Sequence, residues 1–401
     1  MTTGIRPHDS AAGSAPAGAI ARDIVFTFTF ETYGDAVHRG MNRPPDRLLQ
    51  SLMVSEQVRR LLVVNPFRSA PVRALRTVLG KGDARFPADD EHTLYTPLRV
   101  RRQDPTDVPK VRSAFREFDR KVGETARGRG LVHPAVITAN PLMGAFCPFD
   151  WAGPVTFYAR DDWAALPSRE PWWPAIRAAY RSMQASGRAV VAVSQKIIDR
   201  IEPTGPAAVV PNGVEPAEWT GPMPEAPPWL QAIPHPRAIY VGTLDSRLDA
   251  EGLAVLAKAR PDLHVVLLGI RADAGYLDRV LELPNVHVHD QVGRAELAAS
   301  IRNCDLALLS HQRTELTEAM SPLKIYEYLA AGCPVLSIDL APCRNISDRV
   351  LLTDTVDDFV DVLDDALALG RQAEPDRLAF LEANSWKARH QQILSVALRA
   401  T

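Results

Sequence analysis

The sequence has few cysteines, almost no net charge and no long apolar run. Its 401 residues include only four Cys, and their spacing is typical neither of a disulfide framework nor of a metal site, so we expect free thiols in a reducing, cytoplasmic compartment. No apolar run approaches the roughly 20 residues that a membrane-spanning helix requires. The 46 Lys and Arg nearly balance the 48 Asp and Glu, which argues against a general nucleic-acid-binding protein.

Three common enzyme signatures are also missing. No Gly-x-Gly-x-x-Gly run follows an expected strand, so a dehydrogenase is disfavoured. The absence of a Gly-Lys-Ser/Thr run excludes a P-loop enzyme, and no Gly-x-Ser-x-Gly hydrolase elbow is present. What remains is a chain that is 46% hydrophobic and long enough for two domains with sizeable cores.

Strand and helix patterns alternate along this chain. Residues 24–30 alternate β-branched and aromatic side chains and predict a strand. Residues 46–60 show helical spacing of apolar side chains, and residues 60–66 predict a second strand with its exit turn. The same alternation of strand and helix patterns recurs further along the chain. Strand–helix–strand units build parallel sheets, so we predict an α/β fold.

Composition divides the chain into five segments. Residues 1–21 are rich in Ala, Gly, Ser and Pro, which predicts a disordered tail. Residues 216–236 hold seven prolines and predict a linker between two domains, at residues 22–215 and 237–380. Residues 381–401 contain the last expected helix.

A short helix with marked ends begins near residue 321. Ser321 can cap its N-terminus, Pro322 suits the first helical position, and Gly332 suits the left-handed residue that ends it. Lys324 lies in the first turn, where the helix dipole disfavours a cation unless an anion such as a phosphate joins it. Glu327 lies on the same face and could accept hydrogen bonds from a ribose. The alternative is a surface ion pair between these two side chains.

Two further polar groups follow expected strands. Asp161 and Asp162 come at the carboxyl end of a strand, where ligands bind in open α/β sheets. They could bind a metal, orient a hydroxyl group or only cap the next helix. Gly242 ends the first strand of the second domain, and Arg247 follows it. This arginine could contact a ligand or pair with a neighbouring aspartate of its loop.

Several of these segments resemble one protein family. Residues 321–333 resemble the donor-binding helix of the large retaining group of GT-B glycosyltransferases, which has a Leu-Lys run, a Glu, Tyr-Leu, Gly and then Pro-Val. Residues 237–249 resemble the Val-Gly-x-Leu-x-x-Arg-x-Asp motif of a bacterial subgroup that includes enzymes of cell-wall and surface polysaccharide synthesis. Residues 156–167 resemble the Asp-Asp-Trp segment of the same subgroup. The family often has a glutamate eight residues before Glu327, where this chain has Ala319.

The resemblance implies a GT-B fold, with two Rossmann-like parallel-sheet domains that face a cleft. Residues 22–215 would form the acceptor-side domain and residues 237–380 the nucleotide-sugar-binding domain. The helix in residues 381–401 would cross back onto the first domain, anchored by Trp386.

The resemblance also implies a set of site residues. Catalysis would involve Asp161, Asp162, Lys324 and Arg247. Glu327 would hold the ribose, and the diphosphate would be held by backbone amides and cations. The residues expected at the donor are Gly242, Arg247, Ser321, Pro322, Leu323, Lys324 and Glu327.

The expected activity is sugar transfer from a nucleotide-diphosphate sugar, with retention. We expect no metal and no other cofactor, because the second domain has no Asp-x-Asp cluster and has two cations instead. The acceptor would be a glycan, a lipid-linked glycan or a small natural product. The ten Lys and Arg against three Asp and Glu in residues 39–85 favour either peripheral membrane contact or solvated helix faces. Two alternative functions are a GT-B nucleotide-sugar 2-epimerase and a non-catalytic binding subunit.

Overall fold

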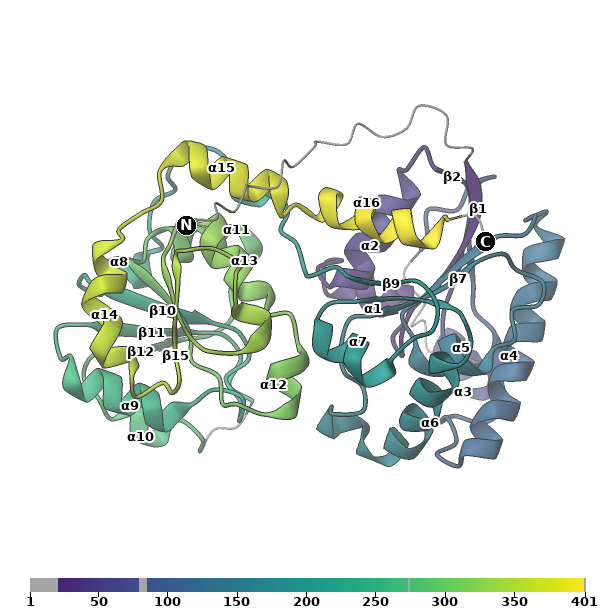
Figure 1. The fold of residues 1–401 in the computed structure, drawn as a ribbon, viewed down its shortest axis with the longest axis horizontal. Coiled ribbons are helices and arrows are strands. Elements are labelled where there is room, and N and C mark those ends of the chain that lie inside the picture. Colours follow the sequence, from purple (N-terminus) through teal and green to yellow (C-terminus); the bar gives the residue numbers. More distant parts are fainter. Residues whose placement is uncertain (1–20, 79–84, 273–274, 400–401) are drawn as a thin grey trace, which may run out of the picture.

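The structure is a computed structural model that describes residues 21–78, 85–272 and 275–399. It contains two α/β domains that lie side by side, each built on a parallel sheet (Figure 1). The predicted fold class is therefore confirmed. The expected tail over residues 1–21 lies outside the described residues, apart from Ala21, and stays a prediction.

The N-terminal domain is built on a seven-stranded sheet in the order β4-β2-β1-β6-β7-β8-β9, with every neighbouring pair parallel. Ile24 of β1 pairs with Leu61 of β2 on one side and with Ala135 of β6 on the other. All three side chains are fully or almost fully buried, as expected of central strands that helices cover on both faces. The strands are β1 (Arg22–Thr27), β2 (Val58–Val64), β4 (His92–Tyr95), β6 (Ala135–Thr138), β7 (Val155–Ala159), β8 (Ala189–Ala192) and β9 (Ala207–Val209).

Helices cover this sheet on both faces (Figure 1). Among them α4, α5 and α6 pack against one another, and α2 packs against the last helix of the chain. A separate two-stranded ribbon joins β3 to β5, next to α3. The elements are α1 (Tyr33–His38), α2 (Pro44–Met53), β3 (Arg68–Ser69), α3 (Ala70–Val78), β5 (Leu98–Arg99), α4 (Val108–Gly128), α5 (Pro141–Phe146), η1 (Pro167–Trp172), α6 (Trp173–Gln184) and α7 (Gln195–Ile201).

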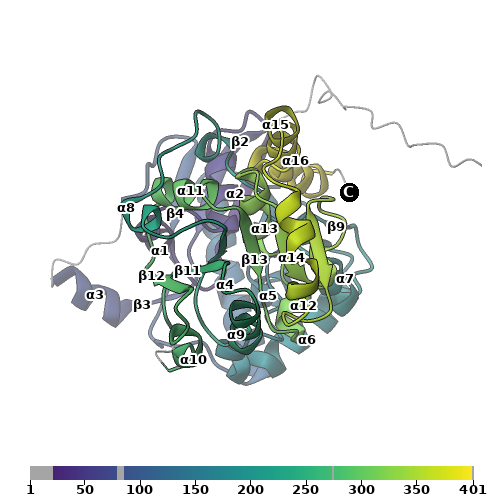
Figure 2. The same cartoon turned by 90° about the vertical axis from the view of Figure 1, so that its left-hand side faces the viewer.

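The C-terminal domain is built on a six-stranded parallel sheet in the order β12-β11-β10-β13-β14-β15. Figure 2 views the molecule from this side. The strands are β10 (Arg237–Val241), β11 (His264–Leu268), β12 (Val286–His289), β13 (Leu306–Leu309), β14 (Val335–Ile338) and β15 (Val350–Thr353). The helices of this half are η2 (Pro216–Glu218), α8 (Pro228–Gln231), α9 (Ala250–Ala259), α10 (Asp278–Leu281), α11 (Arg294–Arg302), α12 (Glu315–Ala319), α13 (Leu323–Ala330), η3 (Ala341–Cys343), α14 (Phe359–Ala368) and α15 (Glu374–Ala383).

The last helix, α16 (Trp386–Ala397), returns to the first domain, as Figure 1 shows. Its Ile393 and Leu394 belong to the N-terminal core, whereas Leu381 of α15 belongs to the C-terminal core. At the crossing point the backbone N–H of Trp386 donates to the carbonyl of Val214, 2.9 Å away. The helix thus ties the two domains together, as the fold prediction requires.

The helix predicted over residues 46–60 is partly wrong. The structure has α2 at Pro44–Met53, and residues 58–64 form β2 instead. Pairing with β1 overrides the helical spacing there, because residues 60–64 line up with residues 23–27 as a parallel strand. The first strand also ends earlier than predicted, at Thr27 rather than residue 30.

Candidate functional site

The N-terminus of α13 lies where the two domains meet, but Ser321 does not cap it. The helix starts at Leu323, and Pro322 is the N-cap residue without any side-chain cap. The Ser321 hydroxyl instead accepts from the backbone N–H of Asn212, at 3.1 Å, and its carbonyl accepts from the Asn212 amide, at 2.7 Å. The predicted cap is therefore wrong, and the first turn of α13 has no side-chain acceptor. The predicted left-handed end is confirmed, since Gly332 has φ of +82°.

Lys324 points from the first turn of α13 toward β10. Its ammonium donates to the Tyr240 hydroxyl, at 2.9 Å, and lies 3.2 Å from Nε2 of His311. It also lies 4.0 Å from the centre of the Tyr240 ring. Within the described part of the chain, no carboxylate lies within ion-pair distance of this ammonium, so the alternative of a pair with Glu327 is not observed. Burial and the nearby charge of Arg247 lower the pKa of Lys324 to about 7.

This lowered pKa should make the stability of the protein depend on pH. An unfolded lysine keeps its proton until about pH 10.4, whereas folded Lys324 releases it near pH 7. The folded state therefore binds fewer protons between these two values, and the free energy of unfolding should rise with pH there. We expect the wild type to gain about 2 kcal/mol more than Lys324→Met between pH 7 and pH 9, measured by urea unfolding. Equal slopes in the two proteins would contradict a strained buried ammonium.

Gly242 leaves room for this ammonium. Its φ is +142°, and a Cβ placed on it would lie 2.9 Å from Nζ of Lys324. A side chain at this position would therefore both strain the backbone and displace the cation. Gly242 thus lies beside Lys324, and its expected contact with a donor stays a prediction.

Arg247 lies in the loop after β10 and pairs with Asp245. Its Nε lies 2.9 Å from Oδ1 and its Nη2 lies 2.7 Å from Oδ2 of that carboxylate. The sequence allowed Arg247 either to contact a ligand or to pair with an aspartate of its loop, and the structure shows the pair with Asp245. A bidentate pair holds the guanidinium plane fixed, and the remaining N–H groups are available for a second anion.

Glu327 is buried beside Arg294 rather than beside Lys324. Its Oε1 lies 2.7 Å from Nη1 of Arg294, and only 8% of its side chain is exposed. Arg294 also pairs with Glu218, which accepts from Arg47 of α2 at 2.6 Å. Burial raises the pKa of Glu327, and the charge of Arg294 opposes this shift. This chain of four charged side chains connects both domains through η2, and the sequence did not predict it.

The adjacent residues Asp161 and Asp162 have different environments. The side chain of Asp162 is fully buried, accepts from the backbone of Ala164 at 3.1 Å and lies 3.1 Å from Arg200. This carboxylate stabilises a turn, and the expected helix cap is not observed, because the next helix, η1, begins at Pro167 without a side-chain cap. The side chain of Asp161 is 30% exposed and lies 3.2 Å from Arg160. Burial raises the pKa of Asp161, and the cations that oppose the shift include Arg247 of the other domain.

The position of the missing glutamate has no substitute nearby. Ala319 is buried, and its carbonyl accepts from the hydroxyl of Ser194. Glu318 pairs with Arg313 at 2.7 Å, and Glu315 lies 3.3 Å from Arg200. Neither carboxylate takes the place that the family pattern would fill. In the described segments, no group of three His, Cys, Asp or Glu side chains could hold a metal ion.

Three comparisons with known proteins agree with this arrangement. Residues 235–368 match the family described as Glycosyl transferases group 1. A stretch of 103 residues, 25% of this chain, is 27% identical to the Bacillus subtilis protein TuaH, which is named as a teichuronic acid biosynthesis glycosyltransferase. That stretch spans about a quarter, 26%, of TuaH.

Solved structures share the whole fold at low identity. The α,α-trehalose 6-phosphate synthase of Burkholderia multivorans superposes with a TM-score of 0.64 at 12% identity, over 94% of this chain and 98% of that one. The sucrose-phosphate synthase of Thermosynechococcus elongatus gives 0.61 at 12% identity, over 94% and 98%. The Anabaena protein HepE, in complex with UDP and glucose, gives 0.54 at 16% identity, over 93% and 98%. These similarities establish the two-domain fold.

Proposed function

We propose that the protein transfers a sugar from a nucleotide-diphosphate sugar to an acceptor, because residues 235–368 match the group 1 glycosyl transferase family and the two domains form a GT-B fold. The observation that carries the proposal is the position and the surroundings of Lys324. This lysine lies in the first turn of α13, where the helix dipole also attracts an anion, and no carboxylate of the described residues lies within ion-pair distance of its ammonium.

The proposed chemistry is stabilisation of a leaving diphosphate. When the bond between the anomeric carbon and the phosphate oxygen breaks, its electron pair stays on that oxygen. The N-terminus of α13, Lys324 and Arg247 would stabilise this new charge from fixed positions. The acceptor hydroxyl would attack the anomeric carbon on the face that the diphosphate leaves, so the configuration is retained.

The first test is binding and turnover with a panel of nucleotide sugars. A bound donor should raise the unfolding temperature, because a ligand at a hundred times its dissociation constant stabilises by about 2.7 kcal/mol. A 2-epimerase would convert the sugar without any acceptor, and a binding subunit would bind the donor without consuming it. Transfer to an added acceptor, with release of the nucleoside diphosphate, separates the proposal from both alternatives.

Asp161 and Asp162 should respond differently to replacement by asparagine. We expect Asp161→Asn to lower turnover by at least about tenfold, because the charge of Arg247, from the other domain, acts on this carboxylate and opposes the rise that burial causes in its pKa. Asp162→Asn should lower the melting temperature more than it lowers the turnover of the folded enzyme, because its carboxylate accepts from the backbone of Ala164 and pairs with Arg200 inside the first domain. If Asp161→Asn keeps full turnover, this residue has no role in the reaction.

Transfer should not require a divalent metal. Lys324, Arg247 and the helix dipole supply the positive charge that a metal provides in other transferases. Activity should stay within about twofold of its starting value in excess EDTA, measured by nucleotide release. Loss of activity in EDTA that manganese or magnesium restores would contradict the proposal.

The acceptor is a glycan, a lipid-linked glycan or a small natural product. The four cysteines are buried free thiols, which supports a cytoplasmic location. In the described ranges, no helix combines the length and apolarity that crossing a bilayer would need.

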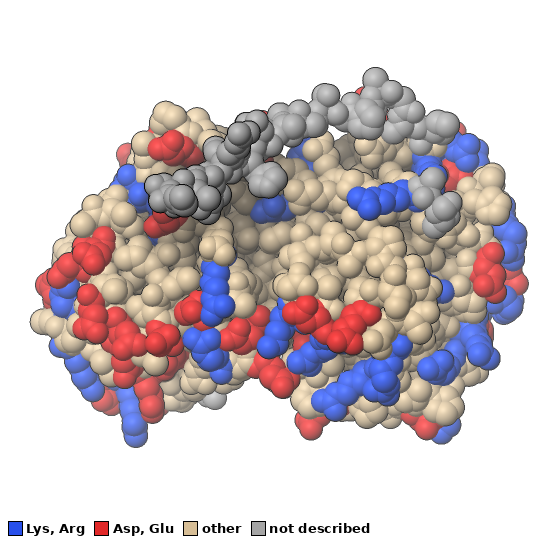
Figure 3. All heavy atoms as spheres, in the orientation of Figure 1, with Lys and Arg blue, Asp and Glu red and all other residues tan. Residues whose placement is uncertain are grey.

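Peripheral membrane contact stays a prediction, with α3 as its place. This helix projects from the body of the molecule (Figure 2) and exposes 37% of Val72 and 59% of Leu75. On the face in Figure 3, Lys and Arg are interspersed with Asp and Glu instead of forming one positive surface.

A further inference from the structure

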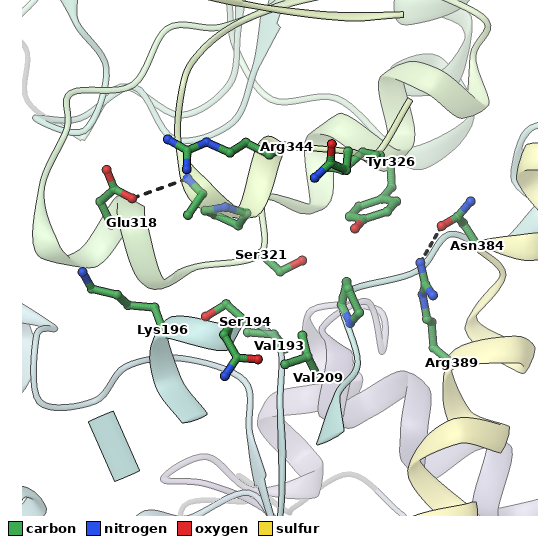
Figure 4. Close-up of a pocket in the computed structure, with 16 residues that line it drawn as sticks. Val193, Ser194, Lys196, Val209, Glu318, Ser321, Tyr326, Arg344, Asn384 and Arg389 are labelled. Atoms are coloured by element: carbon green, nitrogen blue, oxygen red, sulfur yellow. Dashed lines mark hydrogen bonds between the residues drawn. The ribbon is translucent and has the colours of Figure 1, made fainter. Parts of the chain in front are cut away.

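A second cavity lies between the two domains, on the far side of α13 from Lys324. Its volume is about 370 Å³, and its walls come from the loops after β8, β9 and β14 and from the crossing into α16 (Figure 4). Lys324 and Tyr326 are two positions apart on α13, so their side chains point in different directions. Lys324 contacts Tyr240 of the sheet, whereas Tyr326 lines the cavity. The cavity is therefore separate from the proposed diphosphate site.

Arg389 of α16 lines this cavity, and no carboxylate of the described segments lies within ion-pair distance of it. Its Nη2 donates to the neutral amide oxygen of Asn384, and its guanidinium lies 5.8 Å from the centre of the Tyr326 ring. Its Nε is buried and has no hydrogen-bond partner. Burial lowers the pKa of Arg389, since no carboxylate offsets the loss of water. A guanidinium in this state has unused donors that suit an oxyanion.

Lys196 adds a second free cation at the opposite end of the cavity (Figure 4). Across the described residues, it has no carboxylate within ion-pair distance. The other charged groups of the wall are already neutralised. Arg344 pairs with Asp339 at 2.6 Å, and Glu318 pairs with Arg313 at 2.7 Å. The cavity thus has an excess of two positive charges.

We propose that this cavity is a binding site for a small phosphate-bearing molecule, held between Lys196 of the first domain and Arg389 of the crossing helix. The volume lies within the range of about 300–1,000 Å³ that small-molecule sites occupy. Arginine binds phosphate oxygens in a fixed two-pronged geometry, and lysine adds a mobile point charge. The polar groups of Asn384 and Ser321 face the same space and would orient the rest of the molecule.

A ligand in this cavity would be coupled to α13. Ser321 lines the cavity and accepts from the backbone of Asn212, which is part of the first domain's exit loop. Ser194 also lines it and donates to the carbonyl of Ala319. Residues 319–322 therefore connect the cavity wall directly to the first turn of α13. An occupant would hold both domains and this segment in the arrangement seen here.

The test is calorimetric titration of the Lys324→Met protein with inorganic phosphate and with ribose 5-phosphate. This background removes the lysine of the proposed diphosphate site, so binding reports on the cavity even if the proposed function is wrong. We expect both ligands to bind, and we expect adding Arg389→Gln to weaken binding at least tenfold. Adding Lys196→Gln should weaken it by a smaller factor. Citrate at equal ionic strength should bind more weakly than ribose 5-phosphate.

Lys387→Gln is the matched control, because Lys387 is an exposed lysine of α16, the helix that carries Arg389, and does not line the cavity. It should leave phosphate affinity unchanged. If Arg389→Gln impairs folding, Lys196→Gln decides the question, since Lys196 is an exposed surface lysine. Absence of phosphate binding, or equal affinity in the Lys196→Gln and Lys387→Gln proteins, would overturn the proposal.

Discussion

Replacing Lys324 by alanine is expected to lower turnover by about 100- to 1,000-fold, the loss typical of removing one preorganised donor to a developing anion. The ammonium is held by Tyr240 and His311, and among the described residues no carboxylate lies within ion-pair distance of it. Negative charge on the diphosphate grows as the sugar leaves, so Lys324 should stabilise the transition state more than the bound donor. Turnover should therefore fall by a larger factor than donor affinity does.

Three variants isolate this effect. Lys324→Met retains most of the apolar stem, so any loss it shares with Lys324→Ala comes from the charge. Lys258→Ala removes an exposed lysine of α9 in the same domain and should leave turnover unchanged. Gly242→Ala should also lower turnover, because its Cβ would lie 2.9 Å from the ammonium. A raised KM with unchanged kcat in Lys324→Ala would show that the lysine binds donor and transition state equally, against the proposed role.

The parts of this site that the sequence predicted are those fixed by local geometry. Gly332 ends α13 in a left-handed conformation, and the reason lies within a few residues of it. Lys324 lies in the first turn of a helix that follows a buried strand, which spacing alone predicts. Gly242 directly follows β10, as the strand pattern predicts.

Where the prediction failed, the cause is a partner distant in the sequence. Ser321 has the side chain of a good cap, but Asn212, 109 residues earlier, takes its hydroxyl and its carbonyl. Asp161 and Asp162 look alike in the sequence. They differ only because Arg200 and the backbone of Ala164 surround one of them. The spacing of residues along the sequence does not predict such contacts, because they form only when the chain folds.

The chain from Arg47 through Glu218 and Arg294 to Glu327 is the clearest example. Glu218 belongs to a proline-rich segment that predicts only a linker, and nothing in the sequence predicts that Arg294 pairs with it. The fold brings them to within hydrogen-bond distance of each other and of Glu327. The carboxylate expected to hold a ribose is thus paired with a guanidinium.

Glu327→Gln is expected to weaken donor binding by about 10- to 150-fold, since a hydrogen bond to a charged group contributes about 1.5–3 kcal/mol. The ribose hydroxyls would donate to the Glu327 oxygen that Arg294 does not use. Glutamine keeps the shape but offers one neutral acceptor, and its NH₂ group cannot accept from a hydroxyl. The affinity for the nucleoside diphosphate, measured by calorimetry, should fall by the same factor as the affinity for the full donor, because the ribose is common to both.

Glu218→Gln separates the ribose role from the structural one. This variant weakens the pairing of Glu218 with Arg294 and also its pairing with Arg47. Glu218 itself has no expected contact with the donor. If donor affinity falls only because the four paired charges are disturbed, it should fall in both variants. Both variants should then also have a lower unfolding temperature. If only Glu327→Gln loses donor affinity, the carboxylate contacts the ribose directly. Equal losses in the two variants would instead make Glu327 a buried partner of Arg294, whose removal leaves an uncompensated cation between the domains.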